Sequence, residues 1–206
     1  MERDAAAALA AAVSRAMMPG ATLADVATAT DEHATDLMRR AIDLTLNLAM
    51  TSGSIEGFTR LYYEQLADWQ TAQPLHLWEP VPEGYPARSR YNAGSGLERL
   101  PVALALLHLC DDDVNQGIIE GANFGRSCNA IASIVGSIAG ALHGATRIRR
   151  NWIDTCEAAN HDLCTGLEGD QTASFYSMAW RLVNSLKGER RATESRLKAL
   201  DKLLGR

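Results

Sequence analysis

Three glycines recur at four-residue intervals between Ser133 and Gly144, and this spacing limits how the segment can pack. Gly136, Gly140 and Gly144 fall on one face of an α-helix, because residues four apart lie above one another along the helix axis. A glycine in the middle of a helix costs roughly 0.5–1 kcal/mol relative to alanine. We therefore expect this helix to be central and tightly packed, with a neighbouring helix approaching its glycine face closely.

The rest of the sequence predicts an all-α fold, since apolar residues recur at helical spacing and no strand-like alternation persists. The expected helices cover residues 3–18, 23–30, 34–50, 55–70, 96–110, 114–123, 129–143, 150–160, 172–186 and 192–204. Thr22 is the expected N-cap of the second helix, with Asp25 completing a capping box. The acidic run 111–113 is expected to supply the N-cap of the helix that begins at Val114 rather than a cluster of metal ligands.

A long segment from 71 to 95 interrupts the helices. It contains four prolines and two glycines, which exclude a regular helix. Loops of this length inside a compact domain are uncommon and are often functional. Its ring-bearing side chains are candidates for stacking on a base, and the alternative is that they cover the surface: His76, Trp78, Tyr85 and Tyr91.

Charge and composition exclude several classes of function. The net charge is −5 with a pI near 5.5, so the chain lacks the clustered basic face of a nucleic-acid-binding protein. The longest apolar stretch, 131–142, is too short and too rich in glycine and serine to span a bilayer. The four cysteines form no CxxC pair and the N-terminus is charged. We therefore expect a cytoplasmic protein with reduced thiols and one domain over 1–206, with no nucleic-acid or membrane partner.

The residues before the glycine-lined helix carry the strongest functional signal. The stretch Phe124 to Ala132 reads FGRSCNAIA, and residues 94–106 read GSGLERLPVALAL. Both resemble segments of the ADP-ribosylglycohydrolase family, in which a loop G-[GR]-D-x-D-T-[IN]-A opens a helix of the type AxxGxxxGAxxG. Trp152 resembles the family's I-P-x-x-W closure. The order and spacing of these matches indicate a family-like region over about residues 5–160, followed by a C-terminal helical extension over about 170–206.

This resemblance implies a compact orthogonal helical bundle, and hydrolysis of an N- or O-glycosidic bond at a ribose. It also implies two Mg²⁺ ions, held by two aspartates and a threonine of this loop and by a Thr-Asp-Asp motif near the N-terminus. The present chain has Ser127, Asn129 and Ala130 at the loop positions, and we expect an N-terminally truncated family domain without the Thr-Asp-Asp motif. Because Mg²⁺ prefers anionic oxygen ligands, we expect no metal unless a partner chain supplies carboxylates.

Two interpretations of the loop stay open. The start of the helix can receive an anion such as phosphate, or Ser127 or Asn129 can simply cap it. The resemblance implies a binding site for an ADP-ribose-like or nucleotide ligand, with the catalytic residues left unassigned. The expected substrate-binding residues are Ser95, Gly96, Gly125, Arg126, Ser127, Cys128 and Asn129.

The sequence leaves three functions as alternatives. The chain is one subunit of a ribosyl hydrolase completed by a partner chain, or it is a non-catalytic nucleotide-binding or structural subunit. The third alternative is metal-free chemistry by Ser127, Asn129 and residues such as His76 or Glu98. Apolar faces along residues 5–13 and along the glycine-lined helix need cover, which predicts a homo-oligomer or a hetero-oligomer.

Overall fold

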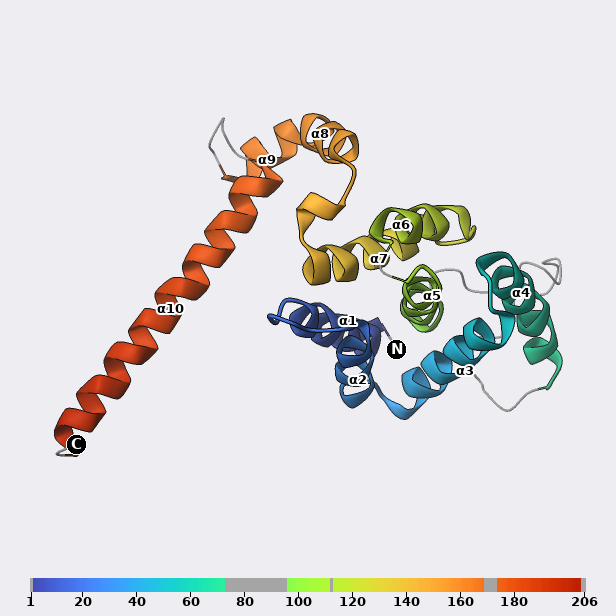
Figure 1. The fold of residues 1–206 in the computed structure, drawn as a ribbon, viewed down its shortest axis with the longest axis horizontal. Coiled ribbons are helices and arrows are strands. Elements are labelled where there is room, and N and C mark those ends of the chain that lie inside the picture. The colour runs from blue at the N-terminus through green and yellow to red at the C-terminus, as the bar shows by residue number, and fades with distance from the viewer. Residues whose placement is uncertain (1, 73–95, 112, 169–173, 205–206) are drawn as a thin grey trace. The chain divides into compact units, whose positions relative to one another are not determined.

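The computed structural model describes residues 2–72, 96–111, 113–168 and 174–204. In these ranges ten α-helices and a short 3-10 helix, η2, follow one another without a strand, so the predicted all-α fold is confirmed (Figure 1). The elements are α1 (Glu2–Ala16), α2 (Leu23–Glu32), α3 (Asp36–Ser52), α4 (Ile55–Ala72), α5 (Gly96–Leu109), α6 (Val114–Asn123), α7 (Cys128–His143), η2 (Ala145–Arg147), α8 (Arg150–Ala159), α9 (His161–Glu168) and α10 (Phe175–Leu203). Among the described helices, none combines the length and the apolar character needed to cross a membrane.

The predicted helix boundaries hold up to α8, where the observed ends differ from the predicted ones by two residues at most. The C-terminal part differs. The helices expected over 172–186 and 192–204 are one continuous helix, α10, and α9 was not predicted. The lysine, glutamate and arginines around Gly188 are strong helix formers, and together they outweigh the cost of roughly 1 kcal/mol that a glycine brings to a helix interior.

Two predicted caps are confirmed. The Thr22 side chain accepts a hydrogen bond from the backbone N–H of Asp25, and the Asp25 carboxylate accepts one from the backbone N–H of Thr22. The Asp113 carboxylate accepts hydrogen bonds from the backbone N–H groups of Asn115 and Gln116, at 3.1 and 3.0 Å. Asp113, the last residue of the acidic run, is therefore the N-cap of α6.

The chain divides into two compact units, Met1–Ile148 and Arg149–Arg206. The first contains α1 to α7 and η2, and the second contains α8 to α10. The single domain expected over 1–206 stays a prediction.

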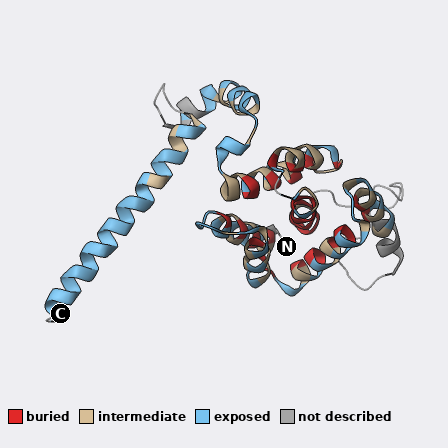
Figure 2. Cartoon of the chain, in the orientation of Figure 1, coloured by how far each residue is buried: buried red, intermediate tan, exposed pale blue. Residues whose placement is uncertain are grey.

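Helix α5 forms the centre of the first unit. Eleven of its fourteen residues are buried, and α1, α2, α3, α6 and α7 all contact it. Figure 1 shows α5 end-on among these helices, and Figure 2 shows the buried residues concentrated there. A helix that is apolar on all sides is stable only when it is surrounded in this way. The expectation that the glycine-lined helix is central is therefore wrong: α7 buries one face, through Ile131, Val135, Ile138 and Ala139.

The alanine-rich helix α1 is covered within the first unit. Ala5, Ala8, Ala12 and Ala16 follow one another at three- or four-residue spacing and form one buried stripe. Helix α1 contacts α2, α5 and α7. This apolar face, which the sequence offers as a surface for a partner, is occupied by the chain's own helices.

Close packing between α6 and α7 depends on glycines of α6. A Cβ atom added at Gly121 would lie 2.9 Å from the Cα atom of Ala132 on α7. One added at Gly117, a turn earlier, would lie 3.1 Å from Cγ1 of Val135. The two helices therefore meet backbone to backbone at Gly121.

The glycines of α7 do not make the predicted close approach. A Cβ atom added at Gly136 or Gly140 would lie 3.7 Å from side-chain atoms of Ile118 or Ile148, which is an ordinary van der Waals distance. Gly144 lies beyond the helix, where it forms the C-cap with a φ of 82°. Only Gly136 and Gly140 of the three predicted glycines therefore lie within the helix, and the steric requirement for glycine lies on the partner helix α6.

We expect opposite effects from two glycine-to-alanine substitutions. Gly121→Ala is expected to lower the free energy of unfolding by about 1–3 kcal/mol, because the new methyl group meets the α7 backbone. Gly136→Ala is expected to raise it by roughly 0.5–1 kcal/mol, because the added methyl group fits and helix propensity improves. Urea unfolding followed by circular dichroism measures both. Equal effects would contradict the assignment of close packing to α6.

Candidate functional site

The loop between α6 and α7 turns sharply through two residues in the left-handed region. Gly125 has a φ of 87° and Arg126 has a φ of 56°. A Cβ atom at Gly125 would also lie 2.8 Å from the Tyr63 hydroxyl oxygen, so only glycine fits there. For Arg126 the left-handed conformation costs roughly 1–2 kcal/mol. Such a conformation persists only where surrounding contacts enforce it.

A buried carboxylate enforces the conformation of Arg126. Glu98 lies in the first turn of α5 and has no exposed surface. Nε of Arg126 donates a hydrogen bond to Oε2 of Glu98 at 3.1 Å, and the Arg126 side chain is 18% exposed. Oε1 of Glu98 is buried and has no hydrogen-bond partner among the described residues. Glu98 therefore acts on the loop through Arg126, as a positioning residue.

The environment of Glu98 favours its neutral form. Burial raises the pKa of the Glu98 carboxyl from an ordinary value of 4.5 to about 7, although the charge and hydrogen bond of Arg126 and the charge of Arg99 act in the opposite direction. Both protonation states are therefore populated near neutral pH. The ion pair between Glu98 and Arg126 forms fully only above that range.

Aromatic residues of α4 hold the other side of the loop. The Tyr63 hydroxyl donates a hydrogen bond of 2.6 Å to the backbone carbonyl oxygen of Phe124, and the two rings stack with centroids 5.6 Å apart. Tyr62 meets Phe124 edge to face at 5.3 Å, and Phe58 completes the cluster. Burial raises the pKa of both tyrosine hydroxyls, so they remain protonated and Tyr63 keeps its donor. The loop entrance is thereby fixed against α4.

The first turn of α7 follows this loop directly. Ser127 occupies the N-cap position of α7, but its side chain makes no capping hydrogen bond. The interpretation in which the Ser127 side chain caps this helix is therefore wrong. The Ser127 carbonyl oxygen accepts hydrogen bonds from the backbone N–H groups of Ala130 and Ile131, both at 3.0 Å. Cys128 is half-buried, whereas Asn129 is exposed in the second position of the helix and is not an N-cap.

The residues at this site do not fit a pair of Mg²⁺ ions. Ser127 and Asn129 offer neutral oxygens and Ala130 offers none. The carboxylate that contacts the loop, Glu98, is engaged with Arg126. Across the described ranges, no group of three or more His, Cys, Asp and Glu side chains is arranged to hold a metal ion. Without anionic ligands a hard divalent cation is bound poorly.

The other predicted site residues are distributed differently. Gly96 is buried at the start of α5, in the same turn as Glu98. Trp152 belongs to the second unit, where the Arg149 guanidinium lies 4.8 Å from its ring centroid. Several candidates lie outside the described residues: Ser95, His76, Trp78, Tyr85 and Tyr91.

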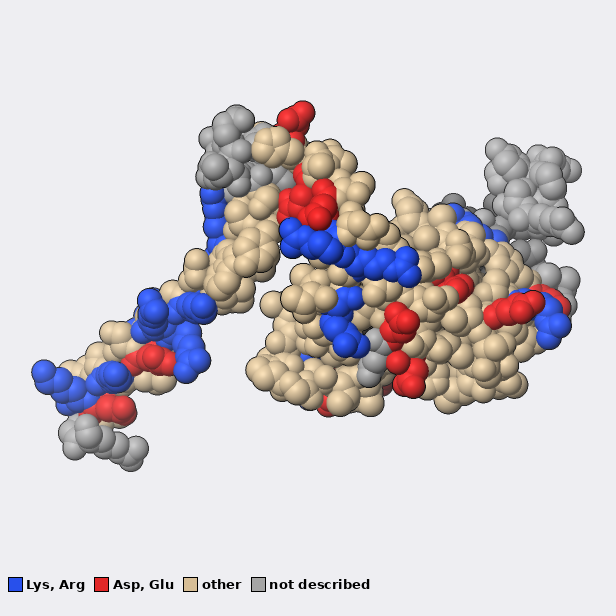
Figure 3. All heavy atoms as spheres, turned by 45° about the horizontal axis from the view of Figure 1, so that its top comes forward, with Lys and Arg blue, Asp and Glu red and all other residues tan. Residues whose placement is uncertain are grey.

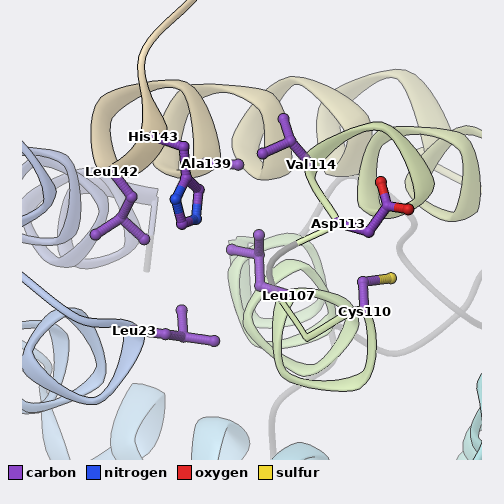
Figure 4. A pocket seen from close by; sticks show the side chains of 8 residues that line it. All are labelled: Leu23, Leu107, Cys110, Asp113, Val114, Ala139, Leu142 and His143. Carbon is purple, nitrogen blue, oxygen red and sulfur yellow. The ribbon is translucent and has the colours of Figure 1, made fainter. Parts of the chain in front are cut away.

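A small apolar cavity between α2, α5 and α7 is no candidate for a ligand. Its lining residues are Leu23, Leu107, Cys110, Asp113, Val114, Ala139, Leu142 and His143, and the side chains of Leu23, Leu107 and His143 converge in Figure 4. Its volume of about 10 Å³ holds one water molecule at most. Burial, with the nearby charges of Glu120 and Asp113, raises the pKa of the Cys110 thiol to about 11, which makes this thiol a poor nucleophile.

Sequence reasoning missed the roles of Tyr63 and Glu98 in shaping the site. Glu98 was named only as a possible participant in metal-free chemistry. One signal was available: Glu98 and Arg99 are the two charged residues in the otherwise apolar run 97–107, and a carboxylate on a buried helix must find a partner. No comparable signal points to Tyr63, whose partner lies 61 residues away in the chain.

A comparison with family models now identifies the chain. The model described as ADP-ribosylglycohydrolase matches residues 2–192 of the 206. Searches of curated proteins and of solved structures give no significant match. The chain belongs to the ADP-ribosylglycohydrolase family, as its loop and helix motifs predicted, and this membership supports a function of the glycosidic hydrolase type.

Glu98→Gln is expected to change the pH dependence of stability. Between about pH 4.5 and pH 7 the Glu98 carboxyl is ionised in the unfolded chain but largely protonated in the folded chain. As the pH rises through this window, the free energy of unfolding of the wild type is expected to fall by roughly 2–4 kcal/mol relative to that of the variant. Glutamine keeps an oxygen acceptor for Arg126. Urea unfolding over a pH series measures the difference, with Glu32→Gln on the exposed end of α2 as the control. A pH-independent difference would show that the carboxyl ionises normally.

Proposed function

We propose that this member of the ADP-ribosylglycohydrolase family binds an ADP-ribose-like or nucleotide ligand at residues 125–129 and serves as one subunit of a hydrolase. The reaction would cleave an N- or O-glycosidic bond at a ribose, with the carboxylates of the active site supplied by a partner chain. The observation that carries this proposal is the Gly125–Arg126 turn at the start of α7, held by the buried carboxylate of Glu98.

Recognition of an anion is the part of this function that the described residues support best. The N-terminus of a helix carries partial positive charge, and its first N–H groups lack partners within the helix. The Arg126 guanidinium, whose Nε binds Glu98, adds positive charge directly before α7. Phosphate groups of a nucleotide are suited to a helix N-terminus with an adjacent arginine.

The proposal of a partner chain rests on the neutral character of the loop. Ser127, Asn129 and Ala130 stand where the family resemblance implies two aspartates and a threonine. The described residues can orient a ligand, but they offer no solvent-facing carboxylate on this loop for acid–base or metal-assisted chemistry. In this proposal Mg²⁺ enters only with carboxylates from the second chain.

A non-catalytic role is the second candidate. The same neutral loop also suits a pseudoenzyme, that is, a nucleotide-binding or structural subunit that keeps the family scaffold. Metal-free chemistry by Glu98 is disfavoured, because its carboxylate has no exposed surface and is covered by Arg126. Ribosyl hydrolysis in the presence of a chain that carries the Thr-Asp-Asp motif distinguishes the subunit of a hydrolase from the pseudoenzyme.

We expect ADP-ribose to bind without Mg²⁺. Isothermal titration calorimetry should give the same affinity with added Mg²⁺ and with a chelator. Arg126→Ala should weaken binding about 10- to 100-fold, in line with the loss of a charged hydrogen-bond donor. Arg191→Ala, on the exposed surface of α10, serves as the control and should have no effect. Binding that requires Mg²⁺, or that is indifferent to Arg126, would contradict the proposed site.

Restoring the family's loop should create metal dependence. In the combined variant Ser127→Asp, Asn129→Asp and Ala130→Thr, ADP-ribose binding is expected to become stronger on addition of Mg²⁺ by about tenfold or more, because the loop gains two anionic ligands. In the same titration, Mg²⁺ should leave the affinity of the wild type for ADP-ribose unchanged, because its loop is neutral. If the restored variant remains insensitive to Mg²⁺, the neutral loop is not the reason for metal-free binding.

A further inference from the structure

Helix α10 of the second unit carries an exposed apolar seam that repeats every seven residues. With Val183 taken as position a of a heptad, the a and d positions are Tyr176, Ala179, Val183, Leu186, Arg190, Thr193, Leu197, Leu200 and Leu204. All but Arg190 and Thr193 are apolar. From Leu186 onward every residue described is exposed, with Leu197 and Leu200 at 56% and 53%. Apolar residues at a and d form the contact seam of a coiled coil.

We propose that α10 pairs with α10 of a second copy of this chain in an antiparallel two-stranded coiled coil. In such a pair each a position faces a d position of the other helix. One register brings the two polar seam residues together. Its facing pairs are Ala179 with the partner's Leu204, Val183 with the partner's Leu200, Leu186 with the partner's Leu197, and Arg190 with the partner's Thr193.

The charges beside the seam select this orientation and register. At the e positions, Lys187 faces the partner's Glu194, and at the g positions, Glu189 faces the partner's Arg196. The two-fold symmetry of a homodimer repeats each attraction, which gives four opposite-charge pairs. A parallel pair places Glu189 opposite the partner's Glu194 and Arg190 opposite the partner's Arg190, and these repulsions oppose its attraction between Arg196 and the partner's Asp201. Figure 3 shows the charged side chains intermixed along the C-terminal half of α10.

Shifting the antiparallel register by one heptad removes this complementarity. A shift in one direction places Glu189 opposite the partner's Glu189. A shift in the other direction places Arg196 opposite the partner's Arg196. Both shifts also place Arg190 opposite a leucine. A polar residue at one seam position is a known means of fixing register at some cost in stability.

Two further features agree with this arrangement. Nε of Arg190 donates to Oε1 of Glu194 at 2.8 Å within the same helix, which compensates the cation at the seam. Gly188 occupies the f position, which points away from the partner. A Cβ atom added there would meet nothing within 4 Å.

A charge swap tests the proposal, and it is independent of the function proposed above. Glu189 and Arg196 have no charged residue three or four positions away in α10, so exchanging them leaves contacts within the helix unchanged. Glu189→Arg alone and Arg196→Glu alone each replace two attractions by two repulsions. Each should weaken the dimer about tenfold, and the double variant should restore it to within about threefold.

Sedimentation velocity of the full chain over a concentration series measures these dissociation constants. Arg191→Glu, at the outward b position, is the matched control and should dimerise as the wild type does. Leu186→Lys with Leu197→Lys should give a monomer whose first unit retains its thermal unfolding transition. A monomeric wild type, or a dimer that survives both lysine substitutions, overturns the proposal. A dimer that Glu189→Arg strengthens is parallel, which overturns the antiparallel pairing.

Discussion

The contact between Glu98 and Arg126 fixes the loop on which the candidate site depends. It is a costly contact, because a carboxyl with no exposed surface loses its hydration, and one of the Glu98 oxygens has no partner in the part of the chain that the structure describes. Its arginine also adopts a left-handed backbone conformation. An apolar pair of similar size would commonly be more stable. Two unfavourable features at one loop are typical of a site held in a particular geometry for binding.

The rest of the first unit makes this contact possible. Helix α5 carries Glu98 into the core, and α6 and α7 lie close enough at Gly121 and Ala132 to hold the ends of the loop. From α4, Tyr63 binds the carbonyl of Phe124 and leaves no room for a side chain at the next residue. The loop is therefore restrained from several helices before any ligand arrives, which reduces the ordering cost of binding.

Local signals in the sequence predicted much of this fold, and tertiary contacts account for what was missed. The caps at Thr22 and Asp113 depend on residues within three positions, and both were predicted. The contact of Glu98 with Arg126 joins residues 28 positions apart, and no local pattern specifies such a pairing. The glycine spacing of α7 did not reveal that the glycines required for close helix packing lie on α6. The sequence analysis also divided α10 into two helices, although the residues on both sides of Gly188 are strong helix formers.

The two interactions proposed for this chain need different partners. A second copy paired through α10 covers the exposed leucine seam, and its charges are complementary to those of the first. That copy carries the same neutral residues, Ser127, Asn129 and Ala130, so self-association adds no carboxylate to the loop from this segment. In the hydrolase proposed above, the carboxylates come from a chain of different sequence. Under these two proposals, a homodimer without such a chain would bind a nucleotide, and a complex containing both partners would carry the carboxylates for bond cleavage.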